Sequence, residues 1–470
     1  MALKIKNFFK SLIGTKAFYK KVIIIAVPVM LQQGITSFVS LLDNLMVGSY
    51  NSLAMTGVGV ANQIYFILQV VLVGGLAAAG IFLAQYFGAK DEEGIKNSFR
   101  FKLQYGLIVL IVALLLLTFY SDVFIKAFLT SPASIEDGKQ IYDYAQKYLY
   151  LMMIGIVPFI ISQIYATTLR EVGSPKLPLY AGIIAFFVNF VINFLLINGH
   201  FGFPRLGIVG AAIGTITSRY VECLFLLLAT HLNHKKFPFM KKIYSTIRVP
   251  VYLSNRIVIK GTPLILNEFL WSFGMTKLLV YYSERGTEVL KDFNISNTVT
   301  NLFFIVFSAL ATAISIIIGQ ALGAGRLEEA RDNVKKLLAF AIFACIISGI
   351  ILAIISPFIP YLYKDITSEV RHMATAFMLI IAVCIPIFGF NSGCFFTLRA
   401  GGVTVVTFLF DAFYVWVVNI PLAIILIRFT DLSIIPLYFI VQASDLIKSI
   451  IGFSIVKTGV WVKNITTVKQ

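Results

Sequence analysis

Residues 22–48, VIIIAVPVMLQQGITSFVSLLDNLMVG, place one carboxylate, Asp43, in an otherwise uncharged apolar run. The run holds 27 residues without a Lys or an Arg. As a helix it is long enough to cross about 30 Å of hydrocarbon, with some length left for tilt. We therefore predict a membrane-spanning helix that carries Asp43.

A carboxylate inside such a helix is costly, so it usually faces a helix bundle or a wet cavity and serves a function. Asp43 is therefore our first candidate for a functional residue. The alternative is that Asp43 lies near the far membrane surface, because the 22 positions from Lys21 to Asp43 correspond to about 33 Å of helix rise.

The rest of the chain has the same character. Of its 470 residues, 59% are hydrophobic and 13% are charged, proportions that no ordinary soluble domain of this length combines. We therefore predict an all-α, polytopic membrane protein. The apolar runs indicate about twelve spans, near residues 22–47, 53–87, 103–129, 148–168, 177–198, 206–232, 258–283, 295–322, 337–361, 373–398, 403–427 and 434–456.

The sequence lacks the motifs that several kinds of chemistry require. The chain has no P-loop, catalytic-triad or metal-binding motif, so we expect neither an enzyme nor a primary pump. A disulfide framework or a zinc site is also disfavoured, because the cysteines lie inside apolar runs without metal-ligand spacing. These cysteines are Cys223, Cys345, Cys384 and Cys394.

The basic residues predict the orientation. With both termini cytoplasmic, the inside segments hold 27 of the 39 Lys and Arg residues and the outside segments hold nine, as the positive-inside rule requires. The net charge of +17 therefore reflects topology, and we expect no nucleic-acid partner. The first apolar run has no cleavage site after it, which argues against a signal peptide. Residues 1–20 are predicted to be a basic segment at the membrane surface, with a flexible tail as the alternative.

The two halves of the chain repeat each other. At a constant separation of 235 positions, Pro28 pairs with Pro263, Asn62 with Asn297, Gln85 with Gln320, and Gly88 with Gly323. The separation holds through the loops QYFGAKDEE and QALGAGRLEE, so we infer a duplication. Each copy has six spans, so both run the same way through the membrane, related by a pseudo-two-fold axis along its normal.

The duplication predicts the domain organisation. Residues 1–232 form an N-terminal six-helix lobe, and residues 258–470 form a C-terminal six-helix lobe. Between them, residues 233–257 form a basic cytoplasmic linker that contains HKKFPFMKKIYSTIRVP. We expect this linker to lie on the membrane, and binding of anionic lipid headgroups is an alternative role.

Three stretches carry a resemblance to a known family: PVMLQQGITSFVSLLDNLMVG in the first span, AQYFGAKDEEG with its echo GQALGAGRLEEA, and LREVGSPKLPLY before the fifth span. Together they resemble the multidrug and toxic compound extrusion (MATE) transporters over nearly the whole chain. The resemblance implies two lobes that open alternately to either side of a plasma (bacterial inner) membrane. It also implies export of a small organic substrate, coupled to entry of H+ or Na+, and we expect no cofactor. We expect the transporter to be a monomer in the lipid bilayer.

Such coupling needs a group whose protonation or ion occupancy changes, and a carboxylate in a low-dielectric cavity suits this task. Similar family members have an acid where this chain has Asp43. Some carry a second acid on the fifth span, four residues after an asparagine. Here Asn189 matches the asparagine, but Asn193 replaces the acid, so it can bond to Asp43 or to Na+ but cannot titrate. We predict an H+ or Na+ site at these three residues, with helix bridging by the asparagines as the alternative.

The second half offers two further coupling candidates. Glu268 lies on the seventh span, eight residues after Lys260 and so about 12 Å into the membrane. Family members often use a glutamate on that span. Asp411 lies on the eleventh span. Two other pairs, Arg219 with Glu222 and Asp445 with Lys448, have i,i+3 spacing and are predicted to neutralise each other.

Candidates for substrate binding and gating are chosen by the chemistry of their side chains. Aromatic rings hold flat cations by cation–π contact, and amides hydrogen-bond polar groups. The candidates are Gln33, Tyr65, Phe66, Trp271 and Asn391. Pro28 and Pro263 each remove a helical hydrogen bond, so we predict that their helices bend when an ion binds.

The combined prediction is a cation-coupled antiporter that exports bulky cationic or amphipathic compounds by alternating access. The alternative is a flippase of the same superfamily for a lipid-linked saccharide or precursor. That function needs a basic cavity to hold pyrophosphate, but only Arg219, Lys277 and Lys448 lie in spans. A receptor or scaffold would show a large soluble domain, which the sequence lacks.

Overall fold

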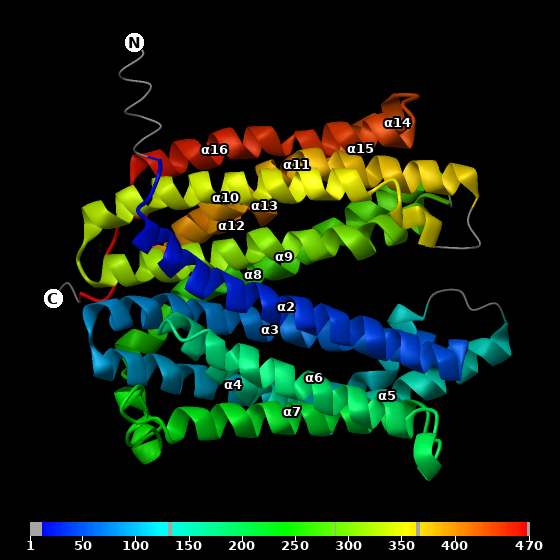
Figure 1. The fold of residues 1–470 in the computed structure, drawn as a ribbon, viewed down its shortest axis with the longest axis horizontal. Helices are drawn as coiled ribbons and strands as arrows, with labels where there is room; N and C mark the ends of the chain where they lie inside the picture. The colour runs from blue at the N-terminus through cyan, green and yellow to red at the C-terminus, as the bar shows by residue number, and fades with distance from the viewer. Residues whose placement is uncertain (1–11, 130–133, 287, 363–366, 468–470) are drawn as a thin grey trace. The chain divides into compact units, whose positions relative to one another are not determined.

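The computed structural model describes residues 12–129, 134–286, 288–362 and 367–467 (Figure 1). The prediction for residues 1–20 therefore lies mostly outside the described residues. The long helices of the first half are α2 (Lys16–Tyr50), α3 (Ser52–Ala89), α4 (Glu92–Phe128), α5 (Ile135–Glu171), α6 (Lys176–Leu196) and α7 (Ile208–His231). The long helices of the second half are α8 (Val251–Ser283), α9 (Glu288–Gly323), α10 (Leu327–Ile355) and α11 (Ser368–Ala400).

The last two spans are divided into shorter pieces. The eleventh span consists of α12 (Thr404–Phe410), α13 (Ala412–Tyr414), the π-helix η5 (Val415–Asn419) and α14 (Ile420–Phe429). The twelfth consists of α15 (Ile434–Ala443) and α16 (Asp445–Thr458). Short 3-10 turns fill some connections: η1 (His200–Gly202), η2 (Pro238–Met240), η3 (Ile243–Ser245) and η4 (Ile359–Leu362).

These elements confirm the all-α membrane fold. Among the described residues, eleven helical segments are long and apolar enough to cross a membrane. Each coincides with a predicted span. The remaining predicted span, residues 258–283, lies in α8, which is 33 residues long but interrupts its apolar surface with Lys260, Glu268 and Lys277. Its charged residues, and not its length, distinguish α8 from the other eleven segments.

The chain divides into two compact units. The N-terminal unit comprises Leu31–Leu83 and Asp91–Ile257. The C-terminal unit comprises Val258–Gln470 together with Met1–Met30 and Ala84–Lys90, as far as these are described. The division falls inside α2, α3 and α8, so these three helices pass from one unit to the other. Pro28 lies in α2 two positions before its division, where a bend would act on both parts.

The core of the C-terminal unit explains why the first part of α2 belongs to it. Val22, Ile25 and Ala26 are buried in one apolar cluster with side chains of α9, α10 and α11. Burial of such side chains removes apolar area and adds close packing contacts. In the N-terminal unit, α5 and α6 both pack on α7.

The two copies of the repeated motif cross at glycines within the C-terminal unit. A Cβ atom on Gly88 would lie 2.0 Å from the backbone oxygen of Gln320. A Cβ atom on Gly323 would lie 1.9 Å from the backbone oxygen of Gln85. Each glycine of one copy therefore contacts the glutamine of the other. Such reciprocity is what a two-fold axis produces at a self-complementary contact.

Gln85 also anchors the end of the chain. Its side chain is fully buried, and its Nε2 donates to the carbonyl oxygens of Ala400 (2.9 Å) and Lys463 (3.3 Å). Its Oε1 accepts from the backbone N–H of Ile465 at 2.8 Å. These backbone groups of Ala400, Lys463 and Ile465 lie outside helix interiors, where no neighbouring turn provides hydrogen-bond partners. The Gln85 amide supplies the partners instead.

We expect Gly88→Ala to lower thermal stability, because its methyl group cannot coexist with the Gln320 carbonyl and overpacking costs about 1–3 kcal/mol. The measurement is the melting temperature of purified protein in a mild detergent. Gly59→Ala is the matched control on the same helix, because a Cβ there meets nothing within 4 Å. The control should keep or raise the melting temperature. Equal melting temperatures for both variants would contradict the close crossing.

Candidate functional site

Asp43 lies in a polar cluster inside the N-terminal unit. The Asn193 Nδ2 of α6 donates to the Asp43 Oδ1 at 2.6 Å. Asn193 also donates to the Asn189 Oδ1 at 3.2 Å. The i,i+4 spacing puts both asparagines on one face of α6, and both are buried. The structure therefore brings the three residues of the predicted N-terminal site together.

The cluster continues onto α7 and leaves one oxygen without a partner. The Asn189 Nδ2 donates to the Thr215 Oγ1 at 3.4 Å. Among the described residues, no donor reaches the buried Asn193 Oδ1. Gly214 makes room for this oxygen, because a Cβ there would lie 2.0 Å from it. A buried acceptor without a donor is costly, so this oxygen is suited to receive a proton donor or a cation.

Oxygen atoms dominate this cluster. Among the described residues, no group of three or more His, Cys, Asp and Glu side chains could hold a metal ion. Asp43 instead shares its surroundings with the amide oxygens of Asn189 and Asn193. Such neutral and anionic oxygen ligands suit hard cations, so these residues fit Na+ as well as a proton.

Arg219 lies next to this cluster and is held by aromatic rings. Its Nη1 donates to the Tyr65 hydroxyl at 2.7 Å, and its Cζ lies 4.4 Å from the Tyr65 ring centre and 5.0 Å from that of Phe159. Arg219 thus bonds to α3, and its charge also acts on Glu222, the partner that the sequence predicts on its own helix. The Tyr65 ring, predicted to hold a cationic substrate, already binds this guanidinium.

The other predicted substrate residues lie in different surroundings. Gln33 is half-buried and follows Gln32, whose Oε1 accepts from the Arg170 Nη1 at 3.0 Å. Phe66 and Trp271 are exposed on the protein surface. Asn391 is buried in the C-terminal unit. Gln33 and Phe66 belong to the N-terminal unit, as Tyr65 does, and Trp271 and Asn391 belong to the C-terminal unit.

The C-terminal unit holds a second polar cluster around Asp411. The Lys448 Nζ lies 2.7 Å from the Asp411 Oδ1 and forms an ion pair with it. The Asn267 Nδ2 donates to the Asp411 Oδ2 at 3.0 Å, and the Asn267 Oδ1 accepts from the Ala412 backbone at 3.1 Å. Lys448 was predicted to pair with Asp445 on its own helix. The ammonium makes its ion pair across to the eleventh span, and the charge of Asp445 acts on it as well.

This cluster lies where two helices are interrupted. Asp411 separates α12 from α13 with φ −107° and ψ −81°, and the π-helix η5 follows. Ser444 separates α15 from α16, and its carbonyl accepts from the Tyr414 hydroxyl at 2.7 Å. Freed backbone groups inside a membrane need such partners. π-helical turns and interrupted helices are frequent at functional sites, so this region is a second candidate.

Asp445 and Glu268 complete the second cluster. The Asn419 Nδ2 donates to the Asp445 Oδ1 at 3.2 Å, and the Asn391 Nδ2 donates to the Asp445 carbonyl at 3.0 Å. Glu268 follows Asn267 on α8 and is half-buried, and the charges of Arg399 and Asp411 act on it. The two predicted acids of the second half therefore share one electrostatic environment.

Sequence reasoning did not single out Thr215 and Asn267. Both are polar residues in apolar runs and carried only a weak signal. Lys448 was noted as a charge inside a span, and its partner was assigned by spacing along its own helix. A search for polar residues one helix turn apart would have found Thr215, which is followed by Ser218 and Arg219, but not Asn267, which has no polar residue three or four positions away.

Comparison with known proteins agrees with this arrangement. The MatE family model matches residues 28–195 and 263–425, one match in each half. The chain is 24% identical over 453 residues to a probable multidrug resistance protein NorM of Thermotoga maritima, covering 96% of this chain and 95% of that protein. It is 25% identical over 422 residues to the probable multidrug resistance protein YoeA of Bacillus subtilis, covering 88% of each. A solved structure described as an outward-facing conformation of a multidrug resistance MATE family transporter of the MOP superfamily has a similar fold. Its TM-score is 0.82 at 17% identity, over 96% of this chain and 97% of that one.

Proposed function

Because this chain belongs to the MatE family, we propose that it is a cation-coupled antiporter that exports bulky cationic or amphipathic compounds by alternating access. Relatives over nearly its whole length are named as probable multidrug resistance proteins, which supports the substrate class. The observation that carries the proposal is the hydrogen bond from Asn193 to Asp43, beside a buried oxygen without a donor.

The geometry supports a proton-dependent change at these two residues. The ionised Asp43 accepts the Asn193 amide N–H. A protonated Asp43 has a donor oxygen, and the Asn193 Oδ1 is the adjacent acceptor that lacks a donor among the described residues. Protonation therefore favours a rotated Asn193 amide, in the space that Gly214 leaves. Since α2 and α6 both contribute, this rotation changes how the two helices are joined.

The same residues would hold Na+ through the oxygen atoms of Asp43, Asn189 and Asn193. A bound Na+ would neutralise the carboxylate, as a proton does.

A flippase for a lipid-linked saccharide is less favoured by the placement of the cations in the spans. Arg219 is bound by Tyr65, and Lys448 is paired with Asp411. Lys277 is exposed and lies 5.6 Å from the Phe273 ring centre. These cations come from separate places and do not form a basic cluster for pyrophosphate.

The test is transport of a fluorescent cationic dye such as ethidium by purified protein in liposomes. A pH gradient and a Na+ gradient are imposed separately. We expect one of them to drive dye movement above that of protein-free liposomes. If neither gradient moves dye while the protein is folded, the flippase becomes the better proposal.

The same assay tests the predicted bend of α2. In Pro28→Ala the missing helical hydrogen bond is restored, so we expect slower gradient-driven transport. Pro158→Ala inside α5 is the control for loss of a helix proline elsewhere in the chain. Normal transport by Pro28→Ala would remove Pro28 from the mechanism.

A further inference from the structure

The connection between α7 and α8 is strongly basic. From residue 223 to residue 267 the chain has no Asp or Glu. The same stretch has seven cations, Lys235, Lys236, Lys241, Lys242, Arg248, Arg256 and Lys260. An uninterrupted positive stretch of this kind favours an anionic partner.

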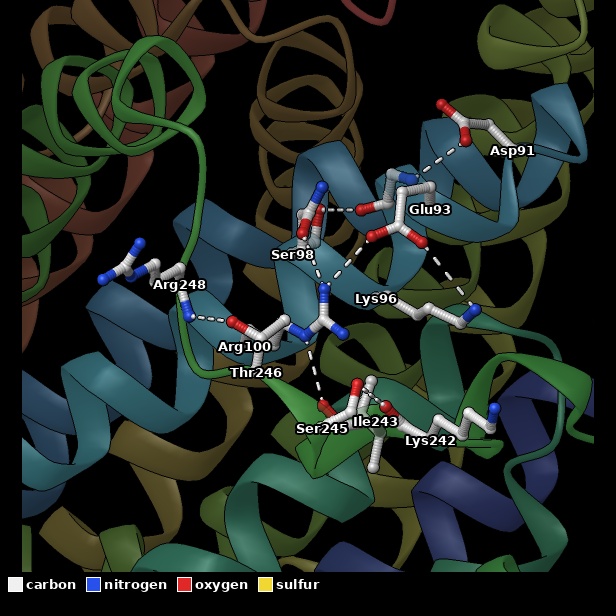
Figure 2. A network of polar contacts seen from close by, with 12 residues as sticks. Asp91, Glu93, Lys96, Ser98, Arg100, Lys242, Ile243, Ser245, Thr246 and Arg248 are labelled. Carbon is white, nitrogen blue, oxygen red and sulfur yellow. Dashed lines mark hydrogen bonds and ion pairs between the residues drawn. The ribbon is translucent and has the colours of Figure 1, made fainter.

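This connection is held firmly against the N-terminal unit. Phe237, Phe239, Met240 and Ile243 are buried, and they fix the two short turns η2 and η3. The buried Arg100 of α4 donates from its Nε to the Ile243 carbonyl at 3.1 Å, as Figure 2 shows. The cations are therefore displayed at defined positions and not on a loose tail.

Two kinds of basic residue can be told apart in this region. Arg100 and Lys96 are used internally, because both bind the carboxylate of Glu93, at 3.1 and 3.7 Å. Lys242 and Arg248 extend away from the Arg100 guanidinium in opposite directions (Figure 2). Within the described residues, the exposed cations of the linker form no ion pair: Lys235, Lys236, Lys241, Lys242 and Arg248.

Exposed apolar side chains are interleaved with these cations. They are Leu232, Tyr244, Ile247, Val251 and Tyr252. The segment also connects two helices that enter the membrane, so it lies within a few residues of the headgroups at both ends. Cations beside exposed aromatic and aliphatic side chains are typical of surfaces that lie in the headgroup region.

We propose that residues 232–252 form a binding surface for anionic phospholipid headgroups, in which the pairs Lys235–Lys236 and Lys241–Lys242 bind the phosphodiester groups. The apolar side chains enter the boundary between headgroups and acyl chains. This proposal does not depend on the transport activity proposed above. It gives the linker a role beyond joining the two repeats.

The test measures phosphatidylglycerol binding to purified full-length protein in neutral detergent micelles by native mass spectrometry, with phosphatidylcholine as the comparison. The variant carries Lys235→Gln, Lys236→Gln, Lys241→Gln and Lys242→Gln. Because each cation near an anionic surface adds to the attraction, we expect its affinity for phosphatidylglycerol to fall about tenfold or more. Its phosphatidylcholine binding should not change.

The control variant removes the same charge from the opposite ends of helices in the same unit, with Lys126→Gln, Lys139→Gln, Lys147→Gln and Arg205→Gln. It should keep phosphatidylglycerol affinity within about twofold, because the linker cations remain. Equal losses in both variants would show a net-charge effect and overturn the proposal. Unchanged affinity in the linker variant would also overturn it. Melting temperatures check that both variants are folded.

Discussion

Asp43→Asn is expected to abolish gradient-driven dye export while the protein stays folded. The asparagine has nearly the same size and still offers an oxygen to the Asn193 amide, which now donates at 2.6 Å. It cannot hold a transferable proton or a negative charge. We therefore expect the transport rate to fall about tenfold or more, since an ionisable group inside a membrane span usually drives the cycle.

The control for this variant is Asp122→Asn. Asp122 is an exposed carboxylate on α4, bonded to Tyr142 and Gln146. Its replacement should leave export unchanged. Asp43→Glu keeps a titratable carboxylate but places it one methylene further from the backbone. Partial export by this variant would show that the loss in Asp43→Asn comes from the missing ionisable group and not from a changed side-chain shape. Normal export by Asp43→Asn would make Asp43 a structural group near the membrane surface.

Lys448→Met should be the most destabilising single change in the second cluster. It removes one partner of a largely buried ion pair and leaves Asp411 without its cation. Breaking a buried pair costs about 3–5 kcal/mol, and we expect the lower end because the Asp411 side chain keeps 19% exposure. Methionine keeps much of the apolar stem but loses the ammonium, whose Nζ lies 5.4 Å from the Phe410 ring centre and 5.7 Å from that of Tyr414.

The double variant Asp411→Asn/Lys448→Met tests the cause of this loss. Both charges are then absent, so most of the stability should return. Lys336→Met is the matched control, because Lys336 forms an ion pair with Asp332 on the partly exposed surface of α10. That change should cost under about 1 kcal/mol. Unfolding in detergent measures all three. A double variant no more stable than Lys448→Met would show that lost charge pairing is not the cause.

The Asp411 and Asp43 carboxylates differ in their partners. Both oxygens of Asp411 have partners, an ammonium and an amide. Asp43 accepts from an Asn193 amide whose buried Oδ1 has no donor among the described residues, and the Asn419 Oδ1 beside Asp445 lacks a donor in the same way. We therefore assign the coupling role first to Asp43 and the stabilising role first to Asp411 and Lys448, and the two experiments test these roles separately.

Some features of the structure were predictable because they depend on local pattern. Long apolar runs predict spans wherever water is excluded, since only helices satisfy their own backbone there. The repeat was visible in the spacing of Gln85 and Gly88 to Gln320 and Gly323. The sequence did not predict that the two copies of the repeat cross reciprocally at these residues. A close backbone approach depends on two helices being in contact, which spacing along the chain does not show. The i,i+4 spacing of Asn189 and Asn193 predicted a shared face.

The breaks at Asp411 and Ser444 in the last two spans could not be predicted. No Gly or Pro lies between Thr404 and Ile420 to indicate the break at Asp411, whereas Pro421 lies two positions after the π-helix and is a local signal for it. The break at Ser444 lacks such a residue as well. Both are stable because Tyr414, Asn267 and Asn391 supply hydrogen bonds from other helices. A local pattern does not contain those partners.

The sequence alone thus determined that the chain is a duplicated helical membrane protein with carboxylates inside its spans. The amino-acid composition and the residue spacing of a segment do not depend on the segments that pack against it, so both can be analysed from the sequence. Only the tertiary structure decided which side chains meet. Arg219 hydrogen-bonds to Tyr65 of another helix, and Lys448 forms its ion pair with Asp411 of another helix, while the charges predicted on their own helices, Glu222 and Asp445, also interact with them. Packing sets how each helix is rotated against its neighbours, and spacing along one helix does not contain that information.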